Sequence, residues 1–294
     1  MPGKRFFLER YRRMGHDLSG NERTRSALRV NTLKTDAEAL VERLSRLGAT
    51  LERVGYLRDG YTIGGSGFSL GASFEYLLGL YTLQEAASQF AVEVLGPGRE
   101  ETILDMCAAP GVKTTQISAH MGNTGAIVAV DVSRARLYAL ENNLERMGVV
   151  NCAAYHADAN ELDYGGLLFD RILLDAPCSG NYVADRAWFS KRRPRDFERN
   201  AERQRRLLGK AVGLLRPGGV LVYTTCSLEP EEDELNVQWL LENHNVSLDR
   251  VEGPGSPGLT EALGERLDDE VARCMRFWPD ETGTQGFFVA RVRV

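Results

Sequence analysis

Three residues at the ends of two predicted strands carry side chains that could do covalent chemistry. The stretch ILLDAPCSG places Asp175 and Cys178 directly after an apolar run, and LVYTTCS places Cys226 after another. The thiolate of a cysteine is a nucleophile, and a nearby carboxylate can exchange a proton with the reacting group. These two apolar runs are the fourth and fifth strands of the predicted sheet. Strands four and five are neighbours in the common doubly wound order, so we expect both thiols to face one pocket.

The residues alone leave the role of Cys178 open between a nucleophile, an assisting thiol and a buried thiol at a bend. We interpret Cys152 and Cys274 as small buried apolar residues, which is the usual environment of a single cysteine. The five cysteines contain no C-x-x-C pair, and the four histidines show no metal-ligand spacing. The sequence therefore predicts neither a disulfide framework nor a bound metal.

A Pro-Gly turn follows the first strand of the same repeating pattern, in DMCAAPGVKTTQIS at residues 105–118. Pro110 and Gly111 let backbone amides approach a ligand, and the helix that opens at Lys113 favours an anionic group at its N-terminus. The stretch matches neither G-x-G-x-x-G nor the Walker loop, which disfavours enzymes that bind nucleotide phosphates. Cys107 lies in this loop, where we expect its backbone to matter more than its sulfur.

Two aspartates follow the next two strands. Asp131 lies twenty residues after Gly111 and can accept hydrogen bonds from both hydroxyls of a ribose. Asp158 follows the third strand, where an adenine amino group would lie. A single aspartate at a strand end is more often a helix cap or a turn residue, but the ordered series predicts an adenosine pocket.

These candidate residues require a parallel sheet with helices between its strands. The pattern predicts five strands, at residues 102–106, 126–130, 152–156, 169–174 and 220–225. Helices are expected after Lys113, Ser133, Asp196 and Pro230, and alternating units of this length build a doubly wound sheet with helices on both faces. GFFVARVRV at residues 286–294 alternates like a final strand, with residues 274–278 as its expected partner.

Residues 28–63 predict a smaller α/β unit ahead of this sheet. LRVNTLK indicates a strand, the next helix begins at Thr35 or Asp36 and ends at Gly48, and one or two strands follow. A further helix is expected from Gln84 to Leu95. We therefore predict two domains, a small N-terminal α/β domain at residues 1–80 and a larger domain at residues 81–294.

Composition favours a globular protein. The 294 residues are 43% apolar and 26% charged, and no apolar run reaches 18 residues. The basic start MPGKRFFLERYRRMG lacks the apolar core of a signal peptide, so we expect a cytoplasmic protein that does not enter a membrane. We also expect a monomer.

Two basic regions stand out against the net charge of −5. Residues 186–206 contain nine Lys or Arg and three Asp or Glu, and residues 1–30 contain eight and three. Such stripes can follow the phosphates of a nucleic acid even on an acidic protein. The alternative for residues 186–206 is a solvated helix with ion pairs along its own length.

Taken together, the motifs resemble one family. DMCAAPGVKTTQIS, ILLDAPCSG and LVYTTCSLEPEEDE, with RVNTLK and QEAAS before them and GFFVA at the end, are similar to the NOL1/NOP2/Sun family of RNA cytosine-C5 methyltransferases. The resemblance runs from about residue 28 to the C-terminus. It implies a Rossmann-like, seven-stranded S-adenosylmethionine-dependent methyltransferase domain behind an N-terminal α/β RNA-binding domain.

The resemblance also implies roles for individual residues. The nucleophile falls on Cys226 and the second cysteine on Cys178, which would assist product release, while Asp175 would hydrogen-bond the cytosine. The residues implied to bind S-adenosylmethionine are Cys107, Ala108, Ala109, Pro110, Gly111, Val112, Lys113, Asp131, Arg136, Asp158 and Asp175. Val112 departs from the family, which has a second glycine after Pro-Gly, and a side chain there should narrow the loop.

The expected activity is methylation of RNA at cytosine C5. The compact chain is most similar to archaeal enzymes that act on tRNA, so tRNA is the expected substrate and ribosomal RNA the alternative. A nicotinamide-dependent oxidoreductase on the same sheet is disfavoured by the missing G-x-G-x-x-G. A non-catalytic RNA-binding scaffold is disfavoured by the presence of both cysteines.

Overall fold

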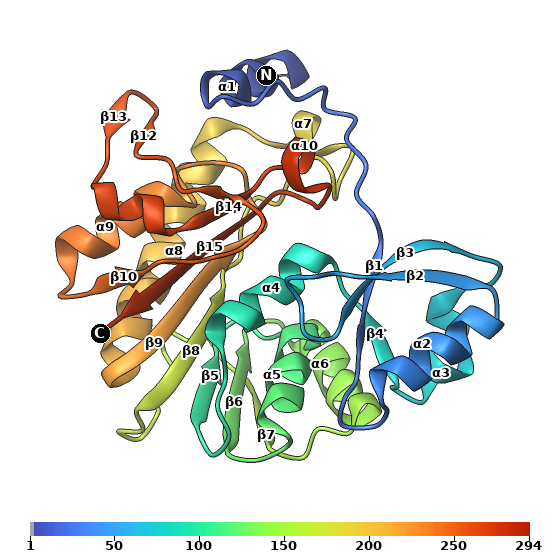
Figure 1. Cartoon of the computed structure of the whole chain (residues 1–294). Helices are drawn as coiled ribbons and strands as arrows, with labels where there is room; N and C mark the ends of the chain where they lie inside the picture. The colour runs from blue at the N-terminus through green and yellow to red at the C-terminus, as the bar shows by residue number, and fades with distance from the viewer. Residues whose placement is uncertain (1–2) are drawn as a thin grey trace. The chain divides into compact units, whose positions relative to one another are not determined.

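The computed structural model describes residues 3–294, which fold into two compact units (Figure 1). The contiguous unit contains residues 25–173, and the split unit contains residues 3–24 and 174–294. The chain passes from the first unit to the second inside one strand, β8 (Phe169–Asp175). The basic start of the chain thus belongs to the same unit as its C-terminal part.

The contiguous unit begins with a small antiparallel sheet in the order β2-β3-β1-β4. Its strands are β1 (Ala27–Val30), β2 (Ala49–Arg53), β3 (Gly60–Ser66) and β4 (Tyr81–Leu83). Helix α2 (Ala37–Arg46) begins where Asp36 accepts hydrogen bonds from two backbone N–H groups, and Leu40 and Leu44 share its buried face. The short helices η1 (Leu70–Ala72) and α3 (Phe74–Leu77) precede β4. The strand and helix predicted at the start of this unit are confirmed.

A parallel sheet makes up the rest of the contiguous unit, in the order β8-β5-β6-β7. Its other strands are β5 (Thr102–Asp105), β6 (Ala126–Asp131) and β7 (Cys152–His156). Its helices are α4 (Ala86–Leu95), α5 (Val112–Met121) and α6 (Arg134–Met147). Strands of a parallel sheet are covered on both faces, which explains why their apolar runs are nearly continuous. The predicted strands and helices of this region are confirmed.

Buried polar side chains connect the small sheet to the helices of the parallel sheet. The guanidinium of Arg29, which is almost fully buried, donates to Thr115 Oγ1 at 2.8 Å. Asn31 Nδ2 donates to the backbone carbonyl of Met147 at 2.8 Å. Because buried donors without partners are costly, these bonds hold the two sheets in one unit. The domain boundary at residue 80 stays a prediction.

The split unit is built on antiparallel strands in the order β11-β14-β15-β9, with β10 also pairing with β15. They are β9 (Leu215–Thr225), β10 (Ser247–Asp249), β11 (Ser256–Pro257), β14 (Met275–Phe277) and β15 (Phe287–Arg293). The seven expected strands are β5 to β9, β14 and β15, and the short strands β10 and β11 are additional.

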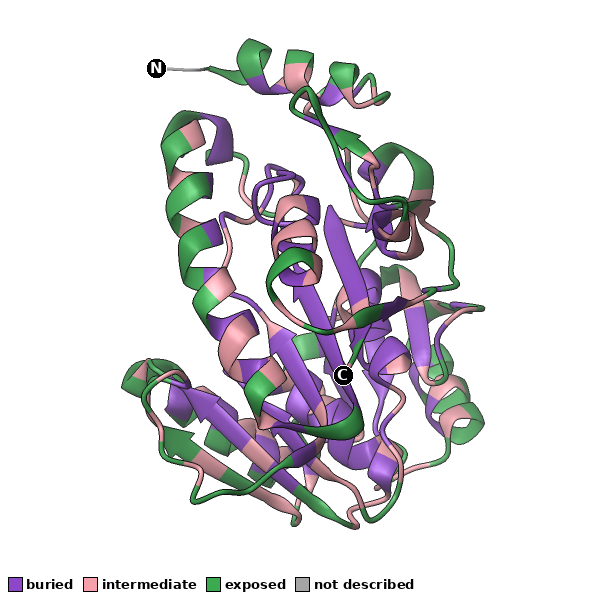
Figure 2. Cartoon of the chain, turned by 90° about the vertical axis from the view of Figure 1, so that its left-hand side faces the viewer, coloured by how far each residue is buried: buried purple, intermediate pink, exposed green. Residues whose placement is uncertain are grey.

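Helices and a hairpin surround the strands of the split unit. They are α7 (Trp188–Lys191), α8 (Pro194–Leu214), α9 (Glu234–Asn243), η2 (Asp269–Arg273), α10 (Pro279–Thr282), and the hairpin of β12 (Glu261–Ala262) and β13 (Glu265–Arg266). Figure 2 shows largely buried strands and helices whose outer faces are exposed. Apolar strands covered by amphipathic helices form the core.

Helix α1 (Lys4–Arg13) is a feature that the sequence patterns did not predict. Its Phe7 and Tyr11, four residues apart, are fully buried in an aromatic core of the split unit. The ring of Phe7 lies 4.8 Å from that of Trp188, and the ring of Tyr11 lies 6.3 Å from that of Trp278. Edge-to-face aromatic pairs at these distances are favourable, so α1 is held by residues from the C-terminal part of the chain.

Candidate functional site

The two predicted thiols meet at the ends of β8 and β9 in the split unit. Cys178 Sγ lies 3.1 Å from Cys226 Sγ. This separation exceeds the ~2.05 Å of a disulfide bond, and both sulfurs are free thiols. The backbone N–H of Ala176 donates to the carbonyl of Thr224 at 2.9 Å, which ties the two strand ends together. The prediction that both cysteines face one place is confirmed.

Cys178 holds its proton more tightly than an ordinary thiol. Its pKa is raised well above the usual value, first by the hydrogen bond with Cys226, then by burial and by the charge of Cys226. A second negative charge beside Cys226 would be repelled. Either sulfur can donate in this contact, and when Cys226 is ionised Cys178 keeps its proton and donates to it.

Asp175 ends β8 three residues before Cys178. Thr224 Oγ1 donates to its Oδ1 at 2.9 Å, which fixes the orientation of the carboxylate. The side chain is only partly buried. A carboxylate held in this way can accept a hydrogen bond from an amino group or a protonated ring nitrogen.

Glu232 joins the two cysteine loops, and sequence reasoning gave it no such role. Its carboxylate accepts from the backbone N–H of Ser179 at 2.9 Å and from Ser227 Oγ at 2.6 Å. Ser179 follows Cys178 and Ser227 follows Cys226, so one buried carboxylate holds both loops. Burial raises the pKa of Glu232, although hydrogen bonds from these two serines oppose the shift.

Other acids before α9 are buried as well. The sequence interpretation placed residues 230–234 in the first turn of a helix, but α9 begins at Glu234, and Glu232 and Asp233 are fully buried ahead of it. Arg276, itself almost fully buried, lies 3.1 Å from Asp233 and 2.5 Å from Glu234. The acidic motif is thus an internal ion-pair network, which the run of charged letters did not reveal.

Helix α1 reaches the same motif through Glu229. Arg10 Nε forms an ion pair with Glu229 Oε2 at 2.7 Å, and Arg10 also pairs with Glu231. Tyr11 Oη donates to Glu229 Oε1 at 2.7 Å. Burial raises the pKa of Glu229 to about 7, although Arg10 acts to lower it. The N-terminal helix therefore supports the loop that carries Cys226.

The predicted cofactor loop lies in the contiguous unit, after β5. Gly111 has a φ of 97°, which side chains rarely adopt, and a Cβ there would come within 2.6 Å of Leu140 Cδ1, so a side chain would be strained. Asp131, buried at the end of β6, accepts from the backbone N–H of Ala109 at 3.1 Å and of Ser133 at 2.9 Å. The loop and the acid are therefore brought together as predicted.

The remaining residues of the cofactor prediction differ in their surroundings. Arg136 donates to the carbonyl of Ala109 and lies 3.6 Å from Asp131 Oδ2. Asp158 is exposed, and its Oδ1 accepts from the backbone N–H of Asn160 in its own turn. The first residues of α5 are Val112, which is partly buried, and Lys113, which is buried. Arg136 thus joins the loop and Asp131, while Asp158 is hydrogen-bonded to Asn160 within its own turn.

The basic region at residues 186–206 lies largely on α8. Four arginines at helical spacing are exposed, namely Arg195, Arg199, Arg203 and Arg206. Within the described part of α8, no ion pair links them to Glu198 or Glu202. The alternative interpretation, in which ion pairs along the helix engage these arginines, does not describe α8.

Comparison with known proteins shows to which family the chain belongs. Residues 92–293 match the family described as 16S rRNA methyltransferase RsmB/F. The chain belongs to the RsmB/F family. This confirms the resemblance to NOL1/NOP2/Sun proteins, and the architecture is the S-adenosylmethionine-dependent methyltransferase fold.

Relatives named for different RNA substrates are similar to this chain. A 28S rRNA (cytosine-C(5))-methyltransferase of Mus musculus is 39% identical, over 94% of this chain and 36% of its own length. A tRNA (cytosine(49)-C(5))-methyltransferase of Pyrococcus abyssi is 36% identical, over 92% of this chain and 88% of its own. The chain thus spans about a third of the mouse relative and most of the archaeal one.

A solved structure agrees with this fold. A methyltransferase homolog protein from Pyrococcus horikoshii superimposes with a TM-score of 0.86 at 39% identity, covering 93% of this chain and 88% of that one.

Among residues 3–294, no helix is both long and apolar enough to cross a membrane.

Proposed function

We propose that this protein methylates RNA at cytosine C5, with Cys226 forming a transient covalent bond to C6 of the target base. The observation that carries the proposal is the 3.1 Å pair of thiols, a geometry in which a protonated Cys178 would donate to an ionised Cys226. The thiolate is the nucleophilic form of cysteine. Membership of the RsmB/F family supports the same reaction.

The chemistry explains why a thiolate is required. Cytosine C5 is a poor nucleophile until a sulfur lone pair adds to C6 and moves electron density to C5. When bound, S-adenosylmethionine supplies the methyl group that C5 accepts. A base then removes the C5 proton, and the bond between C6 and Cys226 breaks to release the methylated product. Asp175, oriented by Thr224, would hold the N3 and amino edge of the base while charge develops on the ring.

Cys178 would act at the end of this sequence. The departing sulfur of Cys226 carries negative charge, and a neighbouring thiol that keeps its proton can donate a hydrogen bond to it. Cys178 would therefore assist product release, and Cys226 would attack the base. Glu232 would hold both loops in the required register.

The contiguous unit offers residues that fit the methyl donor. Asp131 is fixed by backbone donors on both oxygens, and each oxygen keeps a second acceptor position for a ribose hydroxyl. Asp158 is exposed at the next strand end and could accept from an adenine amino group. The backbone of residues 107–113, turned by Gly111, would lie against the rest of the group.

We propose tRNA as the substrate and keep ribosomal RNA as the alternative. The Pyrococcus abyssi relative named for tRNA matches over 88% of its length, whereas the mouse relative named for 28S rRNA matches over 36%. The exposed arginines of α8 are suited to phosphate contacts, and such contacts weaken as salt rises. A monomer and a cytoplasmic location stay predictions.

A mechanism-based RNA tests the reaction. RNA with 5-fluorocytosine has no C5 proton to lose, so with S-adenosylmethionine it should trap the protein in a denaturation-resistant adduct. The adduct should be absent with Cys226→Ala. An adduct that survived Cys226→Ala but vanished with Cys178→Ala would reverse the two roles. Bisulfite sequencing of tRNA and rRNA after gene deletion and restoration would identify the substrate.

A further inference from the structure

A cleft of about 670 Å³ lies in the split unit beside the loop that follows Cys178. Its walls come from the start of α1, from residues 20–24 and from residues 182–189. Three cationic side chains line it, namely Lys4, Arg23 and Arg186, and Glu22 is the one acid in the lining. The walls therefore carry a formal charge of +2, on a protein whose net charge is −5.

The cations of this cleft are available to a ligand. Lys4, Arg23 and Arg186 are exposed, and none of them forms an ion pair within residues 3–294. The acid, by contrast, is already engaged, because Glu22 accepts from Tyr182 Oη at 2.7 Å and from the backbone N–H of Ser19 at 2.6 Å. These bonds lower the pKa of Glu22 against the opposing effect of burial. An anion entering the cleft would thus meet uncommitted positive charge.

The floor of the cleft is aromatic and buried. The rings of Tyr182 and Phe189 stack with centroids 4.8 Å apart and an angle of 18° between them. Both side chains are buried, with 3% and 8% exposure, so neither offers a free face to an incoming base. Little ring surface is open to a stacking base there, and the exposed cations make a phosphate the group that fits best.

The same loop connects the cleft to the thiols. Asn181 is buried, and its Nδ2 donates to the backbone carbonyl of Cys226 at 2.9 Å. Tyr182 follows it, four residues after Cys178, and four residues of chain span at most about 14 Å. A group bound in the cleft is therefore close to a base held at the cysteines.

We propose that Lys4, Arg23 and Arg186 bind backbone phosphates of the nucleotides that flank the target cytosine. The proposal rests on the function proposed above and adds a specific RNA contact to it. Phosphate contacts set the position of the chain without reading sequence. They would hold the flanking RNA while the target base is turned out of its stack toward Cys226.

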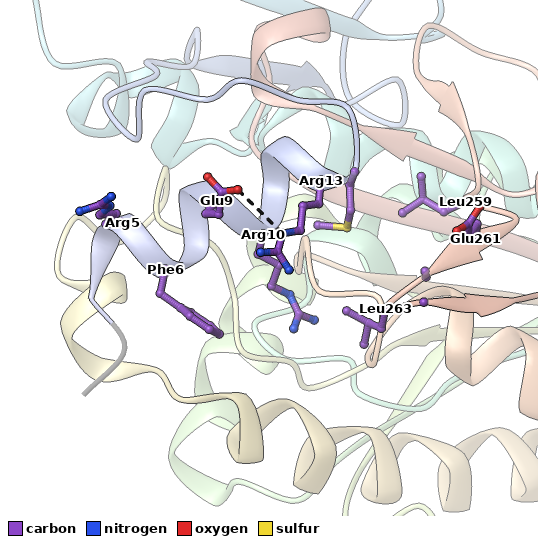
Figure 3. Close-up of a pocket in the computed structure, with 11 residues that line it drawn as sticks. Arg5, Phe6, Glu9, Arg10, Arg13, Leu259, Glu261 and Leu263 are labelled. Atoms are coloured by element: carbon purple, nitrogen blue, oxygen red, sulfur yellow. Dashed lines mark ion pairs between the residues drawn. The ribbon is translucent and has the colours of Figure 1, made fainter.

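A second groove, of about 960 Å³, differs from this cleft in how its cationic side chains are paired (Figure 3). It lies between α1 and the β12–β13 hairpin and is also lined by arginines. Its Arg10 is committed to Glu229 and Glu231, and its Arg13 lies 3.8 Å from Glu9. Its third arginine, Arg5, is exposed and has no ion pair within residues 3–294. That groove thus offers one unpaired cation where the cleft beside Cys178 offers three, so the cleft is the better phosphate site.

Binding at several salt concentrations tests the proposal. We would measure the affinity of the full chain for the RNA that it methylates, as wild type, Lys4→Ala, Arg186→Ala and the double variant. Each single change should weaken binding severalfold. It should also reduce the magnitude of the slope of log K against log[salt] by about 0.7 to 0.9, which is the value for the loss of one phosphate contact. Arg250→Ala is the matched control, because Arg250 is exposed and follows β10, which pairs with the far end of β15.

The outcomes separate this proposal from the proposed function. At saturating protein, the Lys4 and Arg186 variants should still form the 5-fluorocytosine adduct, because the thiols are untouched. Unchanged affinity and salt slope in both variants would overturn the phosphate site while leaving the reaction intact. Equal losses in Arg250→Ala would also overturn it, since the effect would then be one of overall charge. No adduct with any RNA in the wild type would instead refute the reaction.

Discussion

Cys178 Sγ and Cys226 Sγ lie 3.1 Å apart although the two residues are separated by 48 positions in the sequence. The raised pKa of Cys178 fits a pair in which Cys178 keeps its proton when Cys226 ionises. The two cysteines then have different roles in the reaction, and each role can be tested by its own substitution.

Removing the Cys178 thiol should trap the reaction after attack. Cys178→Ala leaves Cys226 able to add to C6 but removes the donor that stabilises the departing sulfur. Turnover should fall by about 100-fold or more, as expected for loss of a proton donor, and an adduct with ordinary cytosine RNA should accumulate. Denaturing gels would show a slow-migrating band, which the Cys178→Ala, Cys226→Ala double variant must lack. Full turnover in Cys178→Ala would contradict the assignment.

Mild oxidation should join the two thiols and stop the reaction. An added disulfide such as oxidised glutathione or a diazene oxidant such as diamide accepts two electrons and two protons as the Cys178–Cys226 bond forms. The sulfurs need to approach only from 3.1 Å to ~2.05 Å. Activity should return with dithiothreitol, and peptide mass spectrometry should show the linked pair. Linkage to buried Cys274 instead would show that the loops rearrange before they react.

Glu232→Gln should slow turnover more than it weakens RNA binding. The amide turns an N–H₂ group toward Ser179 or Ser227, which now donate to the carboxylate, so the two loops lose a shared anchor. One unsatisfied buried donor costs about 1–3 kcal/mol, so folding should survive. Steady-state kinetics should show a lower kcat with KM for RNA nearly unchanged.

Glu231→Gln is the control for that experiment, because Glu231 pairs with Arg10 and is not hydrogen-bonded to either serine. An equal fall in kcat for Glu231→Gln would show that the acidic motif acts through general charge. A rise in KM alone for Glu232→Gln would place the residue in RNA binding.

The stability of the protein should fall as pH rises through neutrality, in part because of Glu229. Its pKa is raised to about 7 in the folded state, from 4.5, first by burial. The folded protein therefore binds this proton more tightly, and the contribution is full below about pH 4.5 and lost as pH rises through about 7. Melting temperatures of wild type and Glu229→Gln should converge or cross as pH increases, since the amide does not titrate. Parallel curves would show that Glu229 is already ionised in the folded protein below neutrality.

Local signals allowed much of the architecture to be predicted. The apolar runs ending at Asp131 and Asp175 are strands because a parallel sheet buries both faces, and Asp36 is a helix cap as its position indicated. The meeting of Cys178 and Cys226 followed from the usual strand order.

Long-range contacts account for what the sequence did not reveal. Tyr11 and Glu229 are 218 positions apart, and the pattern of apolar residues in either segment does not indicate that the two are in contact. Phe7 and Tyr11, spaced four apart in a charged stretch, were a signal for a helix with one buried face. The acids around Glu232 looked solvent-exposed because charged residues are rarely buried without partners, and those partners come from other elements.

The split unit also has a consequence for the order in which the newly made chain can fold. Residues 25–173 are complete as soon as the ribosome has released them, and domains generally fold as units during synthesis. Helix α1 is made before that unit yet packs on Trp188 and Trp278, which are made far later. Until then Phe7 and Tyr11 have no aromatic core to enter, so α1 reaches its final place only after the C-terminal part of the split unit has been made.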